Sequence, residues 1–178
     1  MSIHRRTLTG LMAGGCLILT ACAPTGAHLS TQTDASSLVC SPSDEQGRIA
    51  IAQVRIHADG TQPVLIREVN PKKADNIRIE SFGVIPDDED GFRGVSLPSD
   101  PDAQITTNHE VAAGEHATVQ LVMSLVSPLK SGVIESVELQ YDDLGRTGSE
   151  TATAGLRAQV FPAGEAVPDD SMCELTDE

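Results

Sequence analysis

Hydrophobic and polar residues alternate in short runs along most of this chain, and turn residues separate the runs. The clearest run is 116–126, where five apolar side chains occupy every second position: Ala117, Val119, Leu121, Met123 and Leu125. A period of two places these side chains on one face of a β-strand. We therefore expect a strand here with one buried face and one exposed face.

Seven further runs have a similar β-like character, and no window shows a helical period longer than two turns. They are 48–57, 64–69, 76–85, 92–97, 103–107, 133–141 and 150–161. Within the first, Ala50, Ala52, Val54 and Ile56 are expected to share a face, and the phase change at 81–83 indicates a bulge. Short strands separated by turns every 8–14 residues predict an all-β fold, a single sandwich of about seven to eight strands.

The last two runs, 133–141 and 150–161, resemble the terminal hairpin of an immunoglobulin-like or fibronectin-like domain. The resemblance concerns architecture only and names no family. The chain contains no tryptophan, so the antibody-type pattern of two cysteines around a core tryptophan is absent.

The first 22 residues follow a different pattern. Arg5 and Arg6 precede a mostly apolar stretch at 7–20, which is shorter than the roughly 20 residues needed to span a bilayer. The stretch ends in Leu19-Thr20-Ala21-Cys22, which resembles the lipobox of bacterial lipoproteins. This resemblance implies that residues 1–21 are a cleaved signal peptide and that Cys22 carries a diacylglyceryl anchor with acyl chains such as palmitate. The alternative is plain secretion after an ordinary signal peptidase cut.

The lipobox leads to three expectations about organisation. Residues 22–39, small and polar, are expected to form a lipidated flexible tether, and 40–178 a β-sandwich with an acidic C-terminal tail. Two acyl chains hold a protein on a membrane that it does not span. The expected location is the extracytoplasmic face of the bacterial cell membrane. In a cell with two membranes it is the outer membrane, because Ala23 is not the aspartate that commonly retains lipoproteins at the inner one.

Cys40 and Cys173 remain once Cys16 leaves with the signal and Cys22 carries lipid. An even pair of cysteines in an exported chain predicts one disulfide. Both positions lie outside the predicted strands, and an alternating up-and-down path of an even number of strands would bring them to one end of the sandwich. The alternative is two free or intermolecular thiols.

Charge and composition exclude several functions. The chain has 26 acidic residues against 12 Lys and Arg, a net charge of −14, which disfavours nucleic-acid and anionic lipid surfaces. Aromatic residues make up only 2% of the chain, so the stacking platforms common in sugar sites are scarce. No sequence motif demands a cofactor.

Candidate chemistry is sparse. Asp87, Asp88 and Asp90 form an acidic loop and are weak metal candidates, since the EF-hand frame places Pro86 and Leu97 at ligand positions. The sequence 127–130 fits S-x-x-K, the nucleophile motif of penicillin-binding enzymes, but the motif needs a larger α/β fold. His109, His116 and Met123 recur every seven residues, yet His116 and Met123 fall on opposite faces of one strand.

The sequence thus predicts a non-enzymatic accessory, scaffold or protein-binding module of the cell envelope. Its expected partners are the membrane, through the lipid, and an envelope protein. The alternative is a lipoprotein that binds calcium or a small ligand through its acidic loops.

Overall fold

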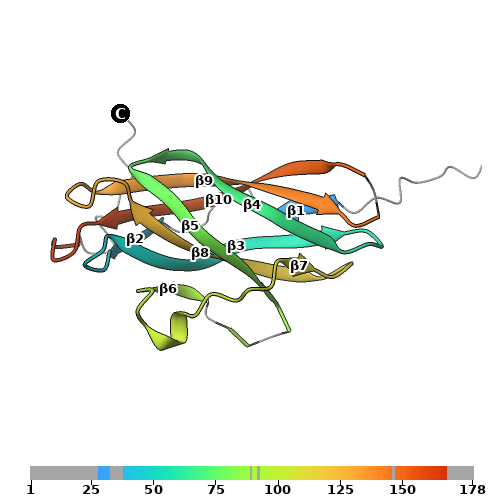
Figure 1. Ribbon diagram of the computed structural model, residues 1–178, viewed down its shortest axis with the longest axis horizontal. Coiled ribbons are helices and arrows are strands. Elements are labelled where there is room, and N and C mark those ends of the chain that lie inside the picture. The colour runs from blue at the N-terminus through green and yellow to red at the C-terminus, as the bar shows by residue number, and fades with distance from the viewer. Residues whose placement is uncertain (1–27, 33–37, 89, 92, 146, 168–178) are drawn as a thin grey trace, which may run out of the picture.

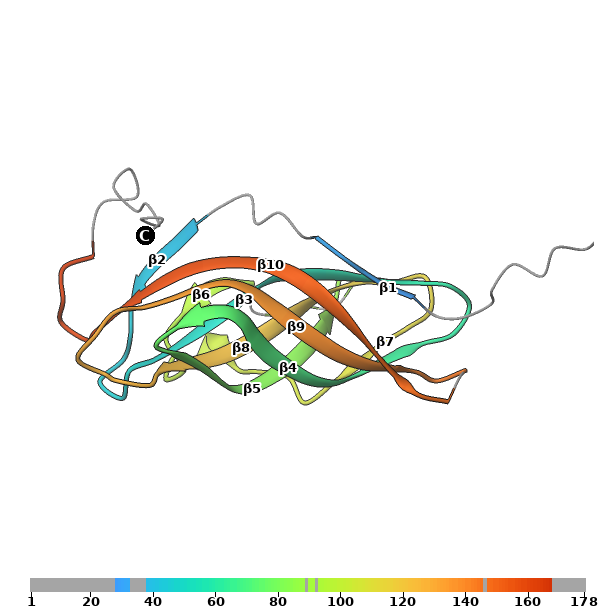
Figure 2. The ribbon, with the colours of Figure 1, turned by 90° about the horizontal axis from the view of Figure 1, so that it is seen from above.

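The computed structural model describes residues 28–32, 38–88, 90–91, 93–145 and 147–167, and these form ten strands in two packed sheets (Figures 1 and 2). Sheet A contains β1 (His28–Thr31), β3 (Arg48–Asp59), β5 (Ile77–Pro86), β6 (Gly94–Ser96) and β8 (His116–Leu125). Sheet B contains β2 (Leu38–Pro42), β4 (Val64–Asp75), β7 (Glu110–Val111), β9 (Gly132–Asp143) and β10 (Ser149–Phe161). A short 3₁₀ turn, η1, covers Pro101–Ala103. The prediction of an all-β sandwich is confirmed, with more strands than the seven to eight expected.

The strand order is that of an immunoglobulin-like domain. Sheet A runs β1-β3-β8-β5, and sheet B runs β2-β10-β9-β4-β7. If β1, β3, β4, β5, β8, β9 and β10 are read as strands A to G, the sheets become ABED and CFG, the constant-type arrangement. The first strand pairs antiparallel with β3 in one sheet, and β2 then pairs parallel with β10 in the other.

The core lies between the two sheets and is almost wholly aliphatic. All five apolar residues predicted on one face of β8 are buried, together with Ile134, Val137 and Leu139 of β9 and Leu156 of β10. Tyr141 is the one aromatic residue among the largest fully buried side chains, and its hydroxyl donates to Glu150 Oε2 at 3.0 Å. Burial raises the pKa of this phenol because the charged form is poorly solvated.

The prediction that Ala50, Ala52, Val54 and Ile56 share one face of β3 was wrong. The register against β8 shifts between Ala52 and Val54, so an extra residue enters the strand there. Before this bulge Ile49 and Ile51 face the core, and after it Val54 and Ile56 do. Ala50 and Ala52 therefore point to the outer face of sheet A, where they are also buried. The bulge predicted in β5 is confirmed, as a register shift between Ile79 and Ser81.

The expected tether, residues 22–39, contains all of β1 and the first two residues of β2. Residues 28–31 form β1, and Leu29, only 2% exposed, joins the core. Cys40 lies inside β2, not before the first strand. The predicted domain boundary at residue 40 is therefore too late, because the domain begins by His28. A strand of four residues with one apolar side chain is too short for its alternation to stand out in the sequence.

The segment 87–109 leaves β5 and crosses the outer face of sheet A before β7 returns the chain to sheet B (Figure 1). Within this segment β6 pairs with Ala50–Ala52 of β3 and so joins sheet A. The strand predicted at 103–107 is not formed, and η1 occupies its start. This segment covers part of the polar outer face of β8, where Thr106 N donates to Gln120 Oε1, and Arg78 Nε of β5 donates to Ser124 Oγ at 3.2 Å. The prediction of one exposed face was therefore also wrong, since Thr118, Gln120 and Ser124 are each at most 2% exposed.

A loop predicted near 70–73 is instead the edge of sheet B, since β4 continues to Asp75. Pro71, Lys72 and Lys73 lie in this half of the strand, which carries register shifts at Pro71/Lys73 and Lys73/Ala74. Proline, lysine and bulges all discourage edge-to-edge pairing with another chain. The proline and lysines that suggested a loop in the sequence therefore lie on an edge strand, where they hinder pairing with a strand of another chain.

The sandwich is elongated, and its two ends are distinct (Figure 2). At the end that we call the N-terminal pole, His57 pairs with His116 and His28 pairs with Asp59. At the distal pole, Arg48 pairs with Ser124, and the turns 43–47 and 126–131 lie together because Leu125 N donates to Gly47 O. Within the described residues, no helix is long and apolar enough to cross a membrane.

Candidate functional site

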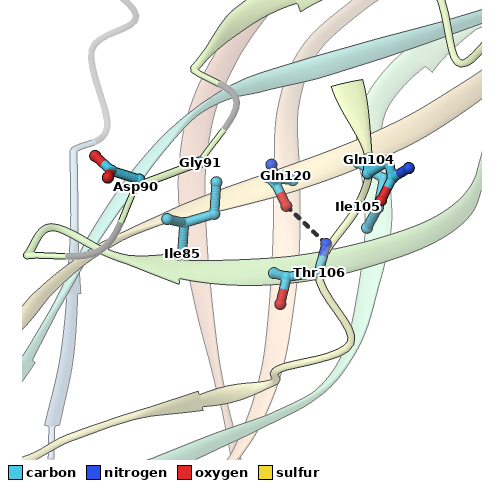
Figure 3. A pocket seen from close by; sticks show the side chains of 7 residues that line it. All are labelled: Ile85, Asp90, Gly91, Gln104, Ile105, Thr106 and Gln120. Carbon is cyan, nitrogen blue, oxygen red and sulfur yellow. Dashed lines mark hydrogen bonds between the residues drawn. The ribbon is translucent and has the colours of Figure 1, made fainter. Parts of the chain in front are cut away.

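A cavity of about 230 Å³ lies between the outer face of sheet A and the segment 87–109. Figure 3 shows its lining, which comes from β5, β8 and two parts of the covering segment: Ile85, Asp90, Gly91, Gln104, Ile105, Thr106 and Gln120. Two isoleucines supply apolar wall, and amide and hydroxyl groups supply hydrogen-bonding capacity.

Gln120 is the most deeply buried polar residue of the cavity, with 1% of its surface exposed. Its register partners are Ala52 on β3 and Gly83 on β5. Its Oε1 accepts a hydrogen bond from Thr106 N at 3.0 Å (Figure 3). This bond holds the covering segment against the sheet, so Gln120 serves structure as well as lining the cavity.

Thr118 lies two residues before Gln120 on the same face of β8 and is 2% exposed. Its Oγ1 has no hydrogen-bond partner among the described residues. A buried hydroxyl without a partner costs about 1–3 kcal/mol. Thr118 and Gln120 therefore form a polar strip on the outer face of sheet A, beneath the covering segment. The alternation of apolar and polar residues in the sequence predicts that this face is exposed to solvent.

The acidic loop lies beside this cavity, but its first aspartate is already engaged. Asp87 Oδ2 lies 3.7 Å from Arg55 Nη1, and Asp87 Oδ1 lies 3.8 Å from Arg93 Nη2. Asp90 lines the cavity, as Figure 3 shows. Among the residues that the structure describes, no group of three or more His, Cys, Asp or Glu is placed to hold a metal ion. The two guanidinium groups provide the counter-charge that a calcium ion would otherwise supply.

We accordingly expect calcium to leave the melting temperature of this protein unchanged. A site filled 100-fold above its dissociation constant would add about 2.7 kcal/mol of stability. Thermal unfolding with excess calcium, and with magnesium as the ionic-strength control, measures this. A large rise specific to calcium and lost in both Asp88→Ala and Asp90→Ala would contradict the expectation.

The histidines do not form one site with Met123. His57 and His116 stack at the N-terminal pole with ring centroids 4.1 Å apart, and His57 Nδ1 lies 2.6 Å from Asp59 Oδ1. A hydrogen bond from Ser30, together with the nearby His57, lowers the pKa of Asp59. His109 stacks on Phe82 at 4.4 Å, away from this group. Met123 is buried in the core on the other face of β8.

The S-x-x-K segment is the turn between β8 and β9. Ser127 N donates to Asn76 Oδ1 at 2.7 Å, and Lys130 N donates to Ser127 O at 3.1 Å. The lysine is exposed. The turn lies at the distal pole of the sandwich.

Cys40 is half-buried in β2 and lies opposite Gln159 of β10 in the parallel ladder. Cys22 and Cys173 lie outside the described residues. Lipidation of Cys22 and the Cys40–Cys173 disulfide therefore remain predictions.

No protein-family model matches the chain, and no curated protein matches it either. Among solved structures, one described as the Vibrio cholerae VesB protease aligns with 15% sequence identity and a TM-score of 0.33. The alignment covers 75% of this chain and 31% of that chain, so this chain spans about a third of the protease chain. At that TM-score the likeness supports no statement about function.

Proposed function

We propose that this protein is a lipid-anchored, non-catalytic binding module of the bacterial cell envelope. The observation that carries the proposal is a short separation along the sequence. Cys22 closes the lipobox, and β1 begins six residues later at His28. Six residues span at most about 20 Å when fully extended. An anchor at Cys22 would thus hold the N-terminal pole of the sandwich next to the membrane.

The first strand is bonded to both sheets, so the chain is fixed to the domain from His28 onward. Besides the pairing of β1 with β3, Thr31 Oγ1 donates to Thr153 O on β10. Gln32 N donates to Arg55 O at 3.4 Å, and Gly155 N donates to Gln32 O at 2.9 Å. An anchor six residues before His28 would therefore face the membrane with the N-terminal pole, and the long axis of the sandwich would point away from the membrane.

We expect Cys22→Ala to abolish membrane attachment or to block processing. Two acyl chains hold a protein on a bilayer, whereas the folded domain is strongly acidic and is repelled by anionic headgroups. Membrane fractionation and mass spectrometry of the mature N-terminus provide the measurement. Cys16→Ala, in the same segment but outside the lipobox, is the matched control and should stay in the membrane fraction. An unmodified N-terminus at a residue other than Cys22 would refute lipidation.

The second candidate function is binding of a small ligand beside the acidic loop. The observation in its favour is the cavity lined by Gln120, Thr106 and Asp90. Since Asp87 already pairs with two arginines, this geometry favours a small organic ligand over a bare metal ion. A ligand of the cavity would raise the melting temperature whether or not Cys22 is lipidated, which separates this candidate from the first.

A further inference from the structure

The turn between β8 and β9 exposes large apolar side chains at the distal pole. Leu129 is 89% exposed and Val126 is 66% exposed, and Pro128 between them is also on the surface. Single exposed leucines are ordinary on protein surfaces. Two large aliphatic side chains within four residues, flanking a proline, form a small apolar projection, which we call the distal tip (residues 126–130).

The distal tip is held in one conformation by a residue from another turn. Asn76 has a φ of 55°, in the left-handed region that asparagine tolerates better than most residues. Its Nδ2 donates to the carbonyl oxygens of Ser127 at 3.1 Å, Lys130 at 2.8 Å and Ser131 at 3.1 Å. Its Oδ1 accepts from Ser127 N, and its carbonyl oxygen accepts from Val126 N at 3.0 Å.

A second contact supports the same turn from the side of β3. A Cβ placed on Gly47 would lie 3.4 Å from Pro128 Cβ, so the two turns lie close together and leave no more room than a methyl group between them. The tip therefore presents Leu129 from a fixed backbone. Fixing a contact residue before binding removes the ordering cost that association would otherwise carry.

Charges around the tip are mostly negative once ion pairs are set aside: of the arginines at this pole, Arg48 pairs with Asp44 and Arg78 pairs with Glu80. Glu45 lies in the turn 43–47, whose Gly47 O accepts from Leu125 N. Asp75 precedes Asn76, and Glu165 lies in the turn after β10, whose Val160 pairs with Gly132. All three are exposed, and Lys130 is the cation within the tip. An apolar projection within an acidic surround is complementary to an apolar pocket with a basic rim.

We propose that the distal tip docks into an apolar pocket, rimmed by lysine or arginine, on another protein of the cell envelope. This rests on the proposed function, because the anchor at Cys22 would place the tip at the end of the domain that points away from the membrane. A basic-rimmed protein pocket is favoured over a bilayer since Glu45, Asp75 and Glu165 would face the anionic headgroups.

A photoreactive residue at position 130, in the full-length protein in intact cells, tests this. The probe is next to Leu129 and leaves that side chain in place. We expect one adduct with a protein other than this chain, whose crosslinked peptide is apolar and flanked by lysine or arginine. Leu129→Ser should lower the yield about tenfold, equivalent to about 1.4 kcal/mol. Glu45→Gln with Asp75→Asn should lower it several-fold.

The matched control is Leu144→Ser, read with the same probe at position 130. Leu144 is 48% exposed at the N-terminal pole, where its N–H donates to Pro63 O. It should leave the adduct at position 130 unchanged. Asn76→Gly keeps access to positive φ but removes the carboxamide, and it should weaken the adduct while Leu129 is intact.

Three results would overturn the proposal: no adduct above background at position 130, an adduct of this chain with itself or with lipid, or a yield that Leu129→Ser does not change. Fractionation of the same samples keeps the two proposals apart. A soluble protein that still forms the adduct refutes the lipid anchor and retains the docking site, whereas an anchored protein without the adduct refutes the docking site alone.

Discussion

Gly83→Val is expected to lower the free energy of unfolding by about 3 kcal/mol, at the upper end of the range for overpacking. A Cβ at this position would lie 2.1 Å from Thr106 O and 2.9 Å from Thr106 C, both of them backbone atoms. The segment 104–108 would have to lift from sheet A. Two hydrogen bonds would break with it, from Thr106 N to Gln120 Oε1 and from Val84 N to Asn108 O at 2.8 Å.

Chemical denaturation measures this loss, and hydrogen exchange shows where it acts. Exchange should become faster at Thr106 and Val84, whereas the amides between β9 and β10 should change only in proportion to global stability. Ser81→Val is the control on the same strand, because Ser81 is exposed. It should change stability by less than about 0.5 kcal/mol. A Gly83→Val protein as stable as its parent would show that the covering segment does not pack on β5 as described.

Loss of the proposed Cys40–Cys173 disulfide is the other large effect we expect, up to about 4–5 kcal/mol for a loop of more than a hundred residues. The position of Cys40 fits the pairing. It lies two register positions before the end of the β2–β10 ladder, where Phe161 pairs with Pro42. Cys173 lies twelve residues after Phe161, and a chain of that length spans up to about 40 Å, more than enough to return to β2.

The test compares Cys40→Ser, Cys173→Ser and the double variant by denaturation, with and without reductant. All three should be equally destabilised, and reductant should affect only the parent protein. Non-reducing peptide mapping of protein from the envelope identifies the bond directly. A Cys40 peptide that migrates apart from Cys173 would end this proposal. The up-and-down path that led us to expect the pairing is not the observed one, because β2 and β10 are parallel neighbours.

The alternation of apolar residues was sufficient for much of the fold. The period of two in β8, and the matching pattern of the β9–β10 hairpin, follow from burying one face of each strand in an aliphatic core. Such local patterns also revealed the bulge near Ser81, since an extra residue reverses the phase in the sequence itself. The lipobox is likewise a local pattern, and it alone suggests a cellular location.

The tertiary structure decided what depends on contacts between distant segments. Alternation could not show that Thr118 and Gln120 are buried, because residues 87–109 cover the outer face of β8. It could not place Leu29 in the core, since β1 gains its position from pairing with β3. Nor could it show that Asn76 holds Leu129 outward from a turn some fifty residues away. Periodicity in the sequence shows which face of a strand packs on the core. Whether another segment covers the opposite face, and which turns bond to each other, depends on contacts between residues that are far apart in the sequence.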